Sequence, residues 1–346
     1  MSRAFLGRAA TALVTLGVAA AIVLPGSSTS VSEAQPATQN VRPVVQTETE
    51  EPPTTPKKYV ALGSSYASGP EGADSLRTRC LRSADNYPQQ VAAAMGFSLI
   101  DATCSGSTTA NILDTPQRFT RSPQIDAVTA DTAVVTITTG GNDIGYIQRL
   151  ISMSCRNVAP PVARQVAARA CNLGRPIPPV PDAVALGDLE AKMLATVYAV
   201  REHAPKARII LVDYPPAVVA GEHPCARLPL TTAEIATAVQ TFDALTAVSK
   251  RVADATGIEL VQASTAGADH TVCSRDPWLL GFELGVPYHP DAAGKRGVAR
   301  LVTKVLRTPA PPIQTPAPLP APPVYVAPVP MYDPNMGIYG YYGYGY

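Results

Sequence analysis

The chain has 346 residues, of which 46% are hydrophobic and 16% are charged, and its formal net charge is +1. This amount of apolar material is enough for one sizeable core. A charge so close to zero gives no electrostatic basis for binding nucleic acid, so we expect no nucleic-acid partner.

The first 34 residues have the pattern of an export signal. Arg3 and Arg8 form a basic start, and residues 9–24 are largely apolar and uncharged. Small residues over 32–34 supply a cleavage site. An uncleaved membrane anchor is the alternative, but about 16 apolar residues are short for a hydrocarbon layer about 30 Å thick. We therefore expect residues 1–34 to be a signal peptide and the protein to be secreted, either outside the cell or into its envelope.

Residues 35–57 contain Pro, Thr, Gln and Glu without a hydrophobic period, which is typical of a linker. From residue 58 the pattern changes, and short runs rich in Val and Ile predict strands at 59–62, 97–102, 133–138, 208–213 and 258–262. Alanine-rich stretches with a helical period predict helices at 87–95, 183–203, 232–256 and 292–306. Strands that alternate with helices favour a parallel sheet covered on both faces. We predict one domain over 58–307, with long loops at 63–86 and 142–182.

The segment 308–346 differs from this domain in composition. It is rich in Pro and Ala at first and ends in a Gly/Tyr run over 339–346. Such a segment cannot build a core, so we predict a disordered tail. Two interpretations remain open for it, a plain spacer and a contact with the cell wall or another partner.

Six cysteines follow the export signal, and an even number in an exported chain predicts disulfides. Their spacing fits no zinc site, so we expect no metal and no cofactor. Six cysteines allow fifteen pairings. Among these we expect neighbours in the sequence to pair, Cys80 with Cys104, Cys155 with Cys171, and Cys225 with Cys273.

Polar residues follow four of the predicted strands, and the carboxyl ends of parallel strands are where such sheets bind ligands. The four blocks are 63–66 (Gly-Ser-Ser-Tyr), 103–107 (Thr-Cys-Ser-Gly-Ser), 139–143 (Thr-Gly-Gly-Asn-Asp) and, after an intervening loop, 288–291 (Tyr-His-Pro-Asp). A serine, a glycine amide, an asparagine amide and a histidine are the groups that acyl transfer needs. The serine attacks, the histidine takes its proton, and the amides stabilise the oxyanion.

These blocks resemble those of the SGNH hydrolases, the GDSL family of esterases and lipases, over residues 58 to about 307. The matching positions, in the family's order, are Ser65, Gly106, Asn142 and His289. The resemblance implies a flavodoxin-like three-layer α/β/α sandwich around a five-stranded parallel sheet. It also implies that Ser65 is the nucleophile, that His289 is the base, and that Ser65, Gly106 and Asn142 form the oxyanion hole. The chain is most similar to secreted actinobacterial members, which carry three disulfides between sequence neighbours.

Two positions depart from the family's pattern. Ser64 replaces the aspartate that usually precedes the nucleophile, and Val286 replaces the triad aspartate three residues before the histidine. Some actinobacterial members orient the histidine with a backbone carbonyl. We therefore expect a Ser65–His289 dyad in which the carbonyl of Val286 accepts a hydrogen bond from His289 Nδ1–H. A carboxylate from Asp269 or Asp276 is the alternative.

Several of these residues also have simpler interpretations. Gly106 suits a tight turn, and Asn142 suits the N-cap of a stretch that begins at residue 144. We interpret Asp143 as structural and Asp291 as the cap of the last helix. His270 is the only rival base, and we place it in a constrained loop near Cys273. An α/β-hydrolase is disfavoured, because that fold places its nucleophile after several strands.

The predicted function is therefore hydrolysis of carboxylic esters, with a small-molecule or lipid ester as substrate and acyl lipids as the default. An envelope sugar O-deacetylase or acyltransferase is the enzymatic alternative. A wall-associated binding protein with a decayed site is the non-enzymatic one. Apolar residues over 278–282 suit either an acyl pocket or the core. We expect a monomer.

Overall fold

The computed structural model describes residues 55–71, 78–118, 120–158, 161, 171, 176–283 and 286–313. All of them belong to the unit Thr54–Tyr346. The predicted signal peptide (1–34), nearly all of the predicted linker (35–57) and most of the predicted tail (308–346) lie outside the described residues. Within the described ranges, no helix is long and apolar enough to cross a membrane.

Five parallel strands form one sheet in the order β2–β1–β3–β4–β5. This is the predicted sheet, and each strand ends within one residue of the apolar run that predicted it. The strands are β1 (Lys58–Gly63), β2 (Ser98–Asp101), β3 (Thr132–Thr138), β4 (Arg208–Val212) and β5 (Glu259–Val261).

The four predicted helices begin and end at the predicted residues: α3 (Tyr87–Met95), α7 (Ala183–His203), α8 (Thr232–Thr256) and α10 (Ala292–Leu306). Each starts at a side chain that accepts a hydrogen bond from a free backbone N–H of the first turn. These capping residues are Asn86, Asp182, Thr231 and Asp291. The predicted role of Asp291 as a helix cap is therefore confirmed.

The predicted long loops at 63–86 and 142–182 contain helices that were not predicted. The first contains α1 (Ser65–Ser68) and the 3₁₀ turn η1 (Arg79–Leu81), and the second contains α5 (Tyr146–Asn157). Helix α5 has no alanine and starts at Gly145 without a side-chain cap, so it lacks both local signals of the other helices. The described residues also include three shorter elements: α4 (Thr109–Leu113), η2 (Gln124–Ala127) and α9 (Ala263–Ala266).

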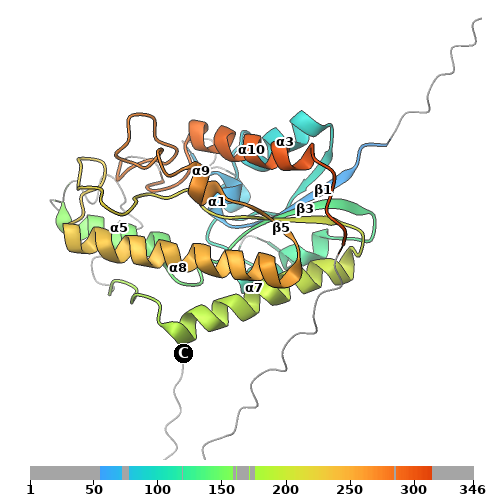
Figure 1. The fold of residues 1–346 in the computed structure, drawn as a ribbon, viewed down its shortest axis with the longest axis horizontal. Helices are drawn as coiled ribbons and strands as arrows, with labels where there is room; N and C mark the ends of the chain where they lie inside the picture. Colours follow the sequence, from blue (N-terminus) through green and yellow to red (C-terminus); the bar gives the residue numbers. More distant parts are fainter. Residues whose placement is uncertain are drawn as a thin grey trace, which may run out of the picture. The chain divides into compact units, whose positions relative to one another are not determined.

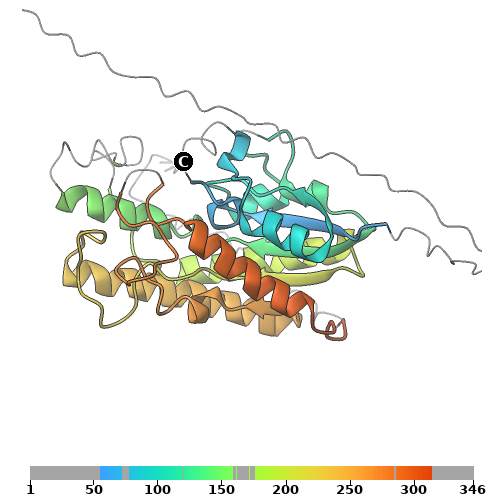
Figure 2. The same cartoon turned by 90° about the horizontal axis from the view of Figure 1, so that it is seen from above.

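Helices cover both faces of the sheet and make a three-layer sandwich, as the resemblance implied. Helices α3 and α10 lie together on one face, and α5, α7 and α8 lie on the other (Figure 1). Figure 2 looks onto the layer of α3 and α10. Alternate residues of a strand point to opposite faces. Tyr59 and Ala61 therefore pack beneath α3 and α10, whereas Val60 and Leu62 belong to the core on the other side.

All three expected disulfides are present, and they join Cys80 to Cys104, Cys155 to Cys171, and Cys225 to Cys273. Each closes a loop of 16 to 48 residues. Loops of this length are among those whose closure stabilises a folded chain by about 2–4 kcal/mol. The pairing between sequence neighbours is confirmed.

Candidate active site

The strand order places three of the predicted site residues at one edge of the sheet. β2 and β3 flank β1 on opposite sides, so the chain order reverses at β1 and leaves a crevice at the carboxyl ends of the strands. Ser65 follows β1, Gly106 follows β2, and Asn142 follows β3. The topology therefore explains why residues far apart in the sequence belong to one site.

A tight turn delivers Ser65 to this edge. Gly63 has φ 142°, and a Cβ there would lie 2.3 Å from the carbonyl oxygen of Thr138 on the neighbouring strand. Glycine is required because no side chain fits this approach. Ser65 is the first residue of α1, so its N–H has no acceptor inside the helix and is open to a ligand. The turn thus presents both a hydroxyl and an amide at the site.

The structure brings Ser65 and His289 into direct contact. His289 Nε2 lies 2.8 Å from Ser65 Oγ, and His289 Nδ1 lies 2.8 Å from the carbonyl oxygen of Pro287. A carbonyl can only accept, so Nδ1 carries the proton and Nε2 is the acceptor for the serine hydroxyl. This is the tautomer that a general base for Ser65 needs.

Burial keeps the histidine in its neutral form. His289 is 6% exposed. Desolvation lowers its pKa to about 4, against the opposing effect of hydrogen bonds to the carbonyls of Pro287 and Val286. At neutral pH the imidazole is therefore unprotonated and able to accept a proton.

The residue expected to orient His289 is corrected by one position. The carbonyl at hydrogen-bond distance from Nδ1 belongs to Pro287, and that of Val286 has the smaller effect on the pKa. The chain turns sharply just before the histidine, because Tyr288 has φ 62°. No residue pattern indicates this turn. The carboxylate alternative fails as well, since Nδ1 is already engaged and both Asp269 and Asp276 are exposed.

Two tyrosines and a serine hold this turn in place. Tyr66 donates a hydrogen bond of 2.7 Å to the carbonyl of Tyr288, and its ring packs against His289 with centroids 5.6 Å apart. The hydroxyl of Tyr288 lies 2.6 Å from Ser154 Oγ in α5. A left-handed conformation at a non-glycine residue costs energy and persists only where its surroundings fix it. Tyr66 stands in the serine motif itself, whereas no pattern indicates Ser154.

At the predicted oxyanion hole, the loop that carries Gly106 also orients Asn142. Asn142 Nδ2 donates to the carbonyl of Ser107 at 2.7 Å, which leaves its second N–H for a ligand. Gly106 has φ 83°, a conformation that favours glycine. The N-cap interpretation of Asn142 was wrong, because α5 begins after Gly145.

Two glutamines missed by the sequence analysis connect the serine turn to the same loop. Buried Gln124 accepts from Gly63 N at 2.7 Å and donates to Gly63 O and to Ser107 Oγ. Gln117 accepts from Ser107 Oγ and donates to the carbonyl of Ser105, each at 2.6 Å. Neither glutamine belongs to a motif, because their partners come from other parts of the chain.

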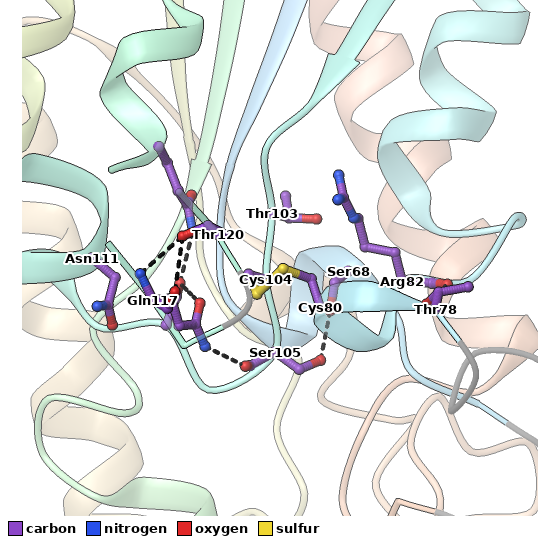
Figure 3. The surroundings of a disulfide bond; sticks show 12 residues. Ser68, Thr78, Cys80, Arg82, Thr103, Cys104, Ser105, Asn111, Gln117 and Thr120 are labelled. Atoms are coloured by element: carbon purple, nitrogen blue, oxygen red, sulfur yellow. Dashed lines mark hydrogen bonds between the residues drawn. A yellow bond between two sulfur atoms is a disulfide. The ribbon is translucent and has the colours of Figure 1, made fainter. Parts of the chain in front are cut away.

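The disulfide between Cys80 and Cys104 fixes this loop from its other end (Figure 3). In Figure 3, Ser105 lies next to the disulfide and contacts both Gln117 and Ser68. The distance between Ser105 Oγ and Ser68 Oγ is 2.8 Å, and Ser68 belongs to α1. The loop of Gly106 is therefore tied to the helix that begins with Ser65.

The residue that replaces the family's aspartate also supports the site. Ser64 Oγ lies 3.2 Å from the hydroxyl of Tyr214, which accepts from Gly141 N at 3.3 Å. Asp143 accepts hydrogen bonds from the N–H and hydroxyl of Thr109, which confirms its structural role. Ser64 and Asp143 thus link the ends of different strands and helices.

The remaining histidines lie elsewhere. His203 and His223 are exposed. His270 stacks on Trp278 with ring centroids 4.7 Å apart, and its Nδ1 contacts the carbonyl of Asp276. Trp278, Leu279 and Phe282 are buried, with Leu279 and Phe282 in the core cluster. Among the described residues, no group of His, Cys, Asp or Glu is arranged to hold a metal ion.

Comparison with known proteins agrees with this geometry. Residues 61–296 match the model of the GDSL-like lipase/acylhydrolase family. The chain is 31% identical to lipase 2 of Streptomyces coelicolor over 271 residues, which are 72% of this chain and 85% of that protein. Two solved structures cover 73% of this chain and 100% of their own, each with a TM-score of 0.54. One is phospholipase A1 of Streptomyces albidoflavus, at 25% identity, and the other is the extracellular lipase of Streptomyces rimosus, at 27%. The chain belongs to the GDSL-like lipase/acylhydrolase family and is a carboxylic ester hydrolase.

Proposed function

We propose that this protein is an exported serine esterase that hydrolyses esters of acyl lipids, with Ser65 as nucleophile and His289 as general base. The observation that carries the proposal is the pair of 2.8 Å contacts at His289, one to Ser65 Oγ and one to the Pro287 carbonyl. Together they fix the tautomer and the direction of proton transfer.

The proposed reaction has two steps. The Ser65 hydroxyl gives its proton to His289 Nε2 while Oγ attacks the ester carbonyl carbon, and the imidazolium then protonates the departing alcohol. Water attacks the acyl-Ser65 in the second step and gives its proton to His289. The acid leaves, and the proton returns to Ser65 Oγ. No cofactor is needed for either step.

Three donors suit the developing oxyanion. They are the N–H of Ser65, the N–H of Gly106 and the second N–H of the Asn142 side chain. The contacts through Gln124, Gln117 and the Cys80–Cys104 disulfide support this assignment, because they hold the three donors' backbone segments together before a substrate arrives. Preorganised donors stabilise the transition state without reorganising during the reaction.

A neutral carbonyl at Nδ1 has a chemical consequence. It stabilises the imidazolium less than a carboxylate would, and burial opposes the imidazolium further. We therefore propose a modest turnover, with a base that stays active at mildly acidic pH.

Substrate class and location rest on the relatives and on the disulfides. The similar proteins are named as lipases and a phospholipase A1, and one of them as extracellular. Three disulfides are typical of proteins that fold in an oxidising compartment. We propose secretion into the envelope or beyond it, action as a monomer, and a cell-wall contact through residues 308–346.

Labelling with a fluorophosphonate probe tests the nucleophile. We expect one adduct on Ser65 in protein with intact disulfides, and none in Ser65→Ala. Ser65→Ala and His289→Ala should each lower kcat by several orders of magnitude. An adduct on another serine would refute the assignment.

A panel of p-nitrophenyl esters from acetate to palmitate, run beside acetylated xylan, tests the substrate class. The proposal requires activity on the longer acyl chains. Activity on acetate alone would instead indicate a sugar O-deacetylase.

A further inference from the structure

One side of the molecule carries a row of cations that the ester-hydrolysing site does not use. Helix α10 contains no carboxylate. We use the term basic face for five residues, four on or next to this helix and one in the preceding loop: Arg296, Arg300, Lys304, Arg307 and Arg275. All five are exposed. Spacings of four, four and three residues place the four helical cations on one side of α10.

The cations of the basic face differ in burial and pairing from Lys295, the other cation of α10. Lys295 points inward, is 1% exposed at its side chain, and lies 2.5 Å from Glu71 and 2.7 Å from Asp85. In the described part of the chain, the five residues of the basic face form no salt bridge. Their positive charge is therefore not compensated by paired carboxylates, as the charge of Lys295 is.

Two adjoining hollows lie along the basic face. One has a volume of about 400 Å³ and is lined by His270, Arg275, Trp278, Asp291, Arg296 and Arg300, among others. The second has a volume of about 550 Å³, shares Arg296 and Arg300 with the first, and extends past Lys304 and Arg307. The small apolar side chains of Ala94 and Ala299 also line the second hollow. The surface therefore offers a shallow, continuous groove rather than one closed pocket.

Positive charge is concentrated at the basic face, although positive and negative charges nearly balance over the whole chain. Five cations line the two hollows, and the carboxylates among the lining residues are Asp276 and Asp291. Asp291 also accepts a hydrogen bond from Gly294 N as the helix cap. The formal net charge of the chain is only +1. Like charges placed close together repel one another, so an anionic partner at this face relieves a local cost.

The position of the basic face relates it to the catalytic site. Asp291, which lines the first hollow, is two residues from His289. Arg296 follows Asp291 by five residues, and the row from Arg296 to Arg307 spans about 16 Å along the helix axis at 1.5 Å per residue. Helix α10 belongs to the outer layer on this side of the sheet (Figures 1 and 2). A partner that lies along the helix therefore reaches the end of α10 at which the catalytic histidine is held.

We propose that the basic face docks this protein on an anionic phospholipid surface, with the cations contacting lipid phosphates. A row of about 16 Å matches several phosphates in one plane, whereas a single small anion occupies only one hollow. The apolar residues that line the second hollow beside the cations suit the boundary between headgroups and acyl chains. The docking itself does not depend on the proposed reaction, although it deepens that proposal by placing lipid esters near Ser65.

Binding of the full chain to vesicles tests this docking. We use ether-linked lipids, which an esterase cannot cleave, and compare vesicles of 30% phosphatidylglycerol in phosphatidylcholine with vesicles of phosphatidylcholine alone. We expect co-sedimentation with the anionic vesicles only, and its loss between low and high salt. The triple variant R296Q/R300Q/K304Q should bind about a hundredfold more weakly, because each cation near such a surface contributes about a fivefold factor.

A matched variant keeps the change in net charge but moves it away from the basic face. K192Q/K206Q/K250Q removes three exposed cations, two of them on α7 and α8 and one in the loop that follows α7. It should bind anionic vesicles like the unmodified chain, and both triple variants should keep the same kcat/KM on soluble p-nitrophenyl butyrate. Equal binding to both vesicle types, or equal losses in the two triple variants, would overturn the docking proposal. So would a basic-face variant that loses binding to soluble heparin but not to vesicles. A chain that binds vesicles but hydrolyses no ester would refute the proposed function alone.

Discussion

The pH dependence of ester hydrolysis gives a quantitative test of how His289 is held. Burial lowers the pKa of His289 to about 4, from an ordinary value near 6.5. The difference corresponds to about 3 kcal/mol of extra cost for charging the ring inside the protein. The perturbation is a change of pH from 8 down to 4.5, with the sequence unchanged.

The two values predict very different profiles. With a pKa of about 4, about 97% of His289 is neutral at pH 5.5, whereas with a pKa of 6.5 only about 9% is neutral. We therefore expect kcat/KM at pH 5.5 to stay close to its plateau, rather than to fall about tenfold. The measurement is kcat/KM for a non-ionising p-nitrophenyl ester, read at the isosbestic wavelength, beside the rate of fluorophosphonate labelling of Ser65.

Two controls separate this titration from others. The folded state binds the His289 proton more weakly than the unfolded state, so the stability it contributes is full above pH 6.5 and is lost as pH falls towards 4. Circular dichroism at each pH shows whether the chain is still folded. Asp213 is the second group in this range, since burial raises its pKa to about 6. A fall in kcat/KM near pH 6 that disappears in Asp213→Asn belongs to Asp213. A fall in kcat/KM between pH 7 and pH 6 in both the unmodified chain and Asp213→Asn would refute our account of His289.

Three further predictions concern single side chains. Asp213→Asn should stabilise the fold at pH 8 by up to about 3 kcal/mol and should have no such effect at pH 4, because burial penalises only the charged carboxylate. Urea unfolding at both pH values measures this difference. An equal effect at the two pH values would contradict the prediction. Tyr66→Phe removes the donor to the buried carbonyl of Tyr288, so we expect a loss of about 1–3 kcal/mol in thermal unfolding and a fall of about tenfold in kcat. An unchanged kcat in that variant would mean that the turn at Tyr288 keeps its conformation without the hydrogen bond from Tyr66. Gly63→Ala should destabilise the fold by about 3 kcal/mol or more, because the new Cβ would clash with the carbonyl oxygen of Thr138. Gly187→Ala in α7 is the contrast, since its Cβ would point into open space, and it should stabilise the fold by about 1 kcal/mol.

Much of the sheet and of the outer helices could be predicted, because their signals are local. The buried strands are short Val- and Ile-rich runs, and four long helices begin at polar caps that stand beside them in the sequence. Helix α5 was missed because it has neither alanine nor a polar cap, although Ile147, Leu150 and Ile151 recur at helical spacing and pack into the core.

The site residues also divide into those with a local sequence signal and those without one. Ser65 and His289 stand in recognisable blocks, whereas Gln124 and Ser154 act through partners that only the folded chain brings near. The acceptor for His289 was placed at Val286 because the spacing of the family's aspartate pointed there. The turn at Tyr288 moves Pro287 into that position instead, and such a turn has no sequence signal at a non-glycine residue.

The crosslink between Cys80 and Cys104 also bears on when the enzyme becomes competent. It anchors the loop of Gly106, and thiols of this kind stay reduced in the cytoplasm and oxidise only after export. With the two thiols reduced, only hydrogen bonds hold that loop. In the exported lipid esterase that we propose, activity toward the lipids of the producing cell should therefore be low before export, and oxidation after export should complete the site.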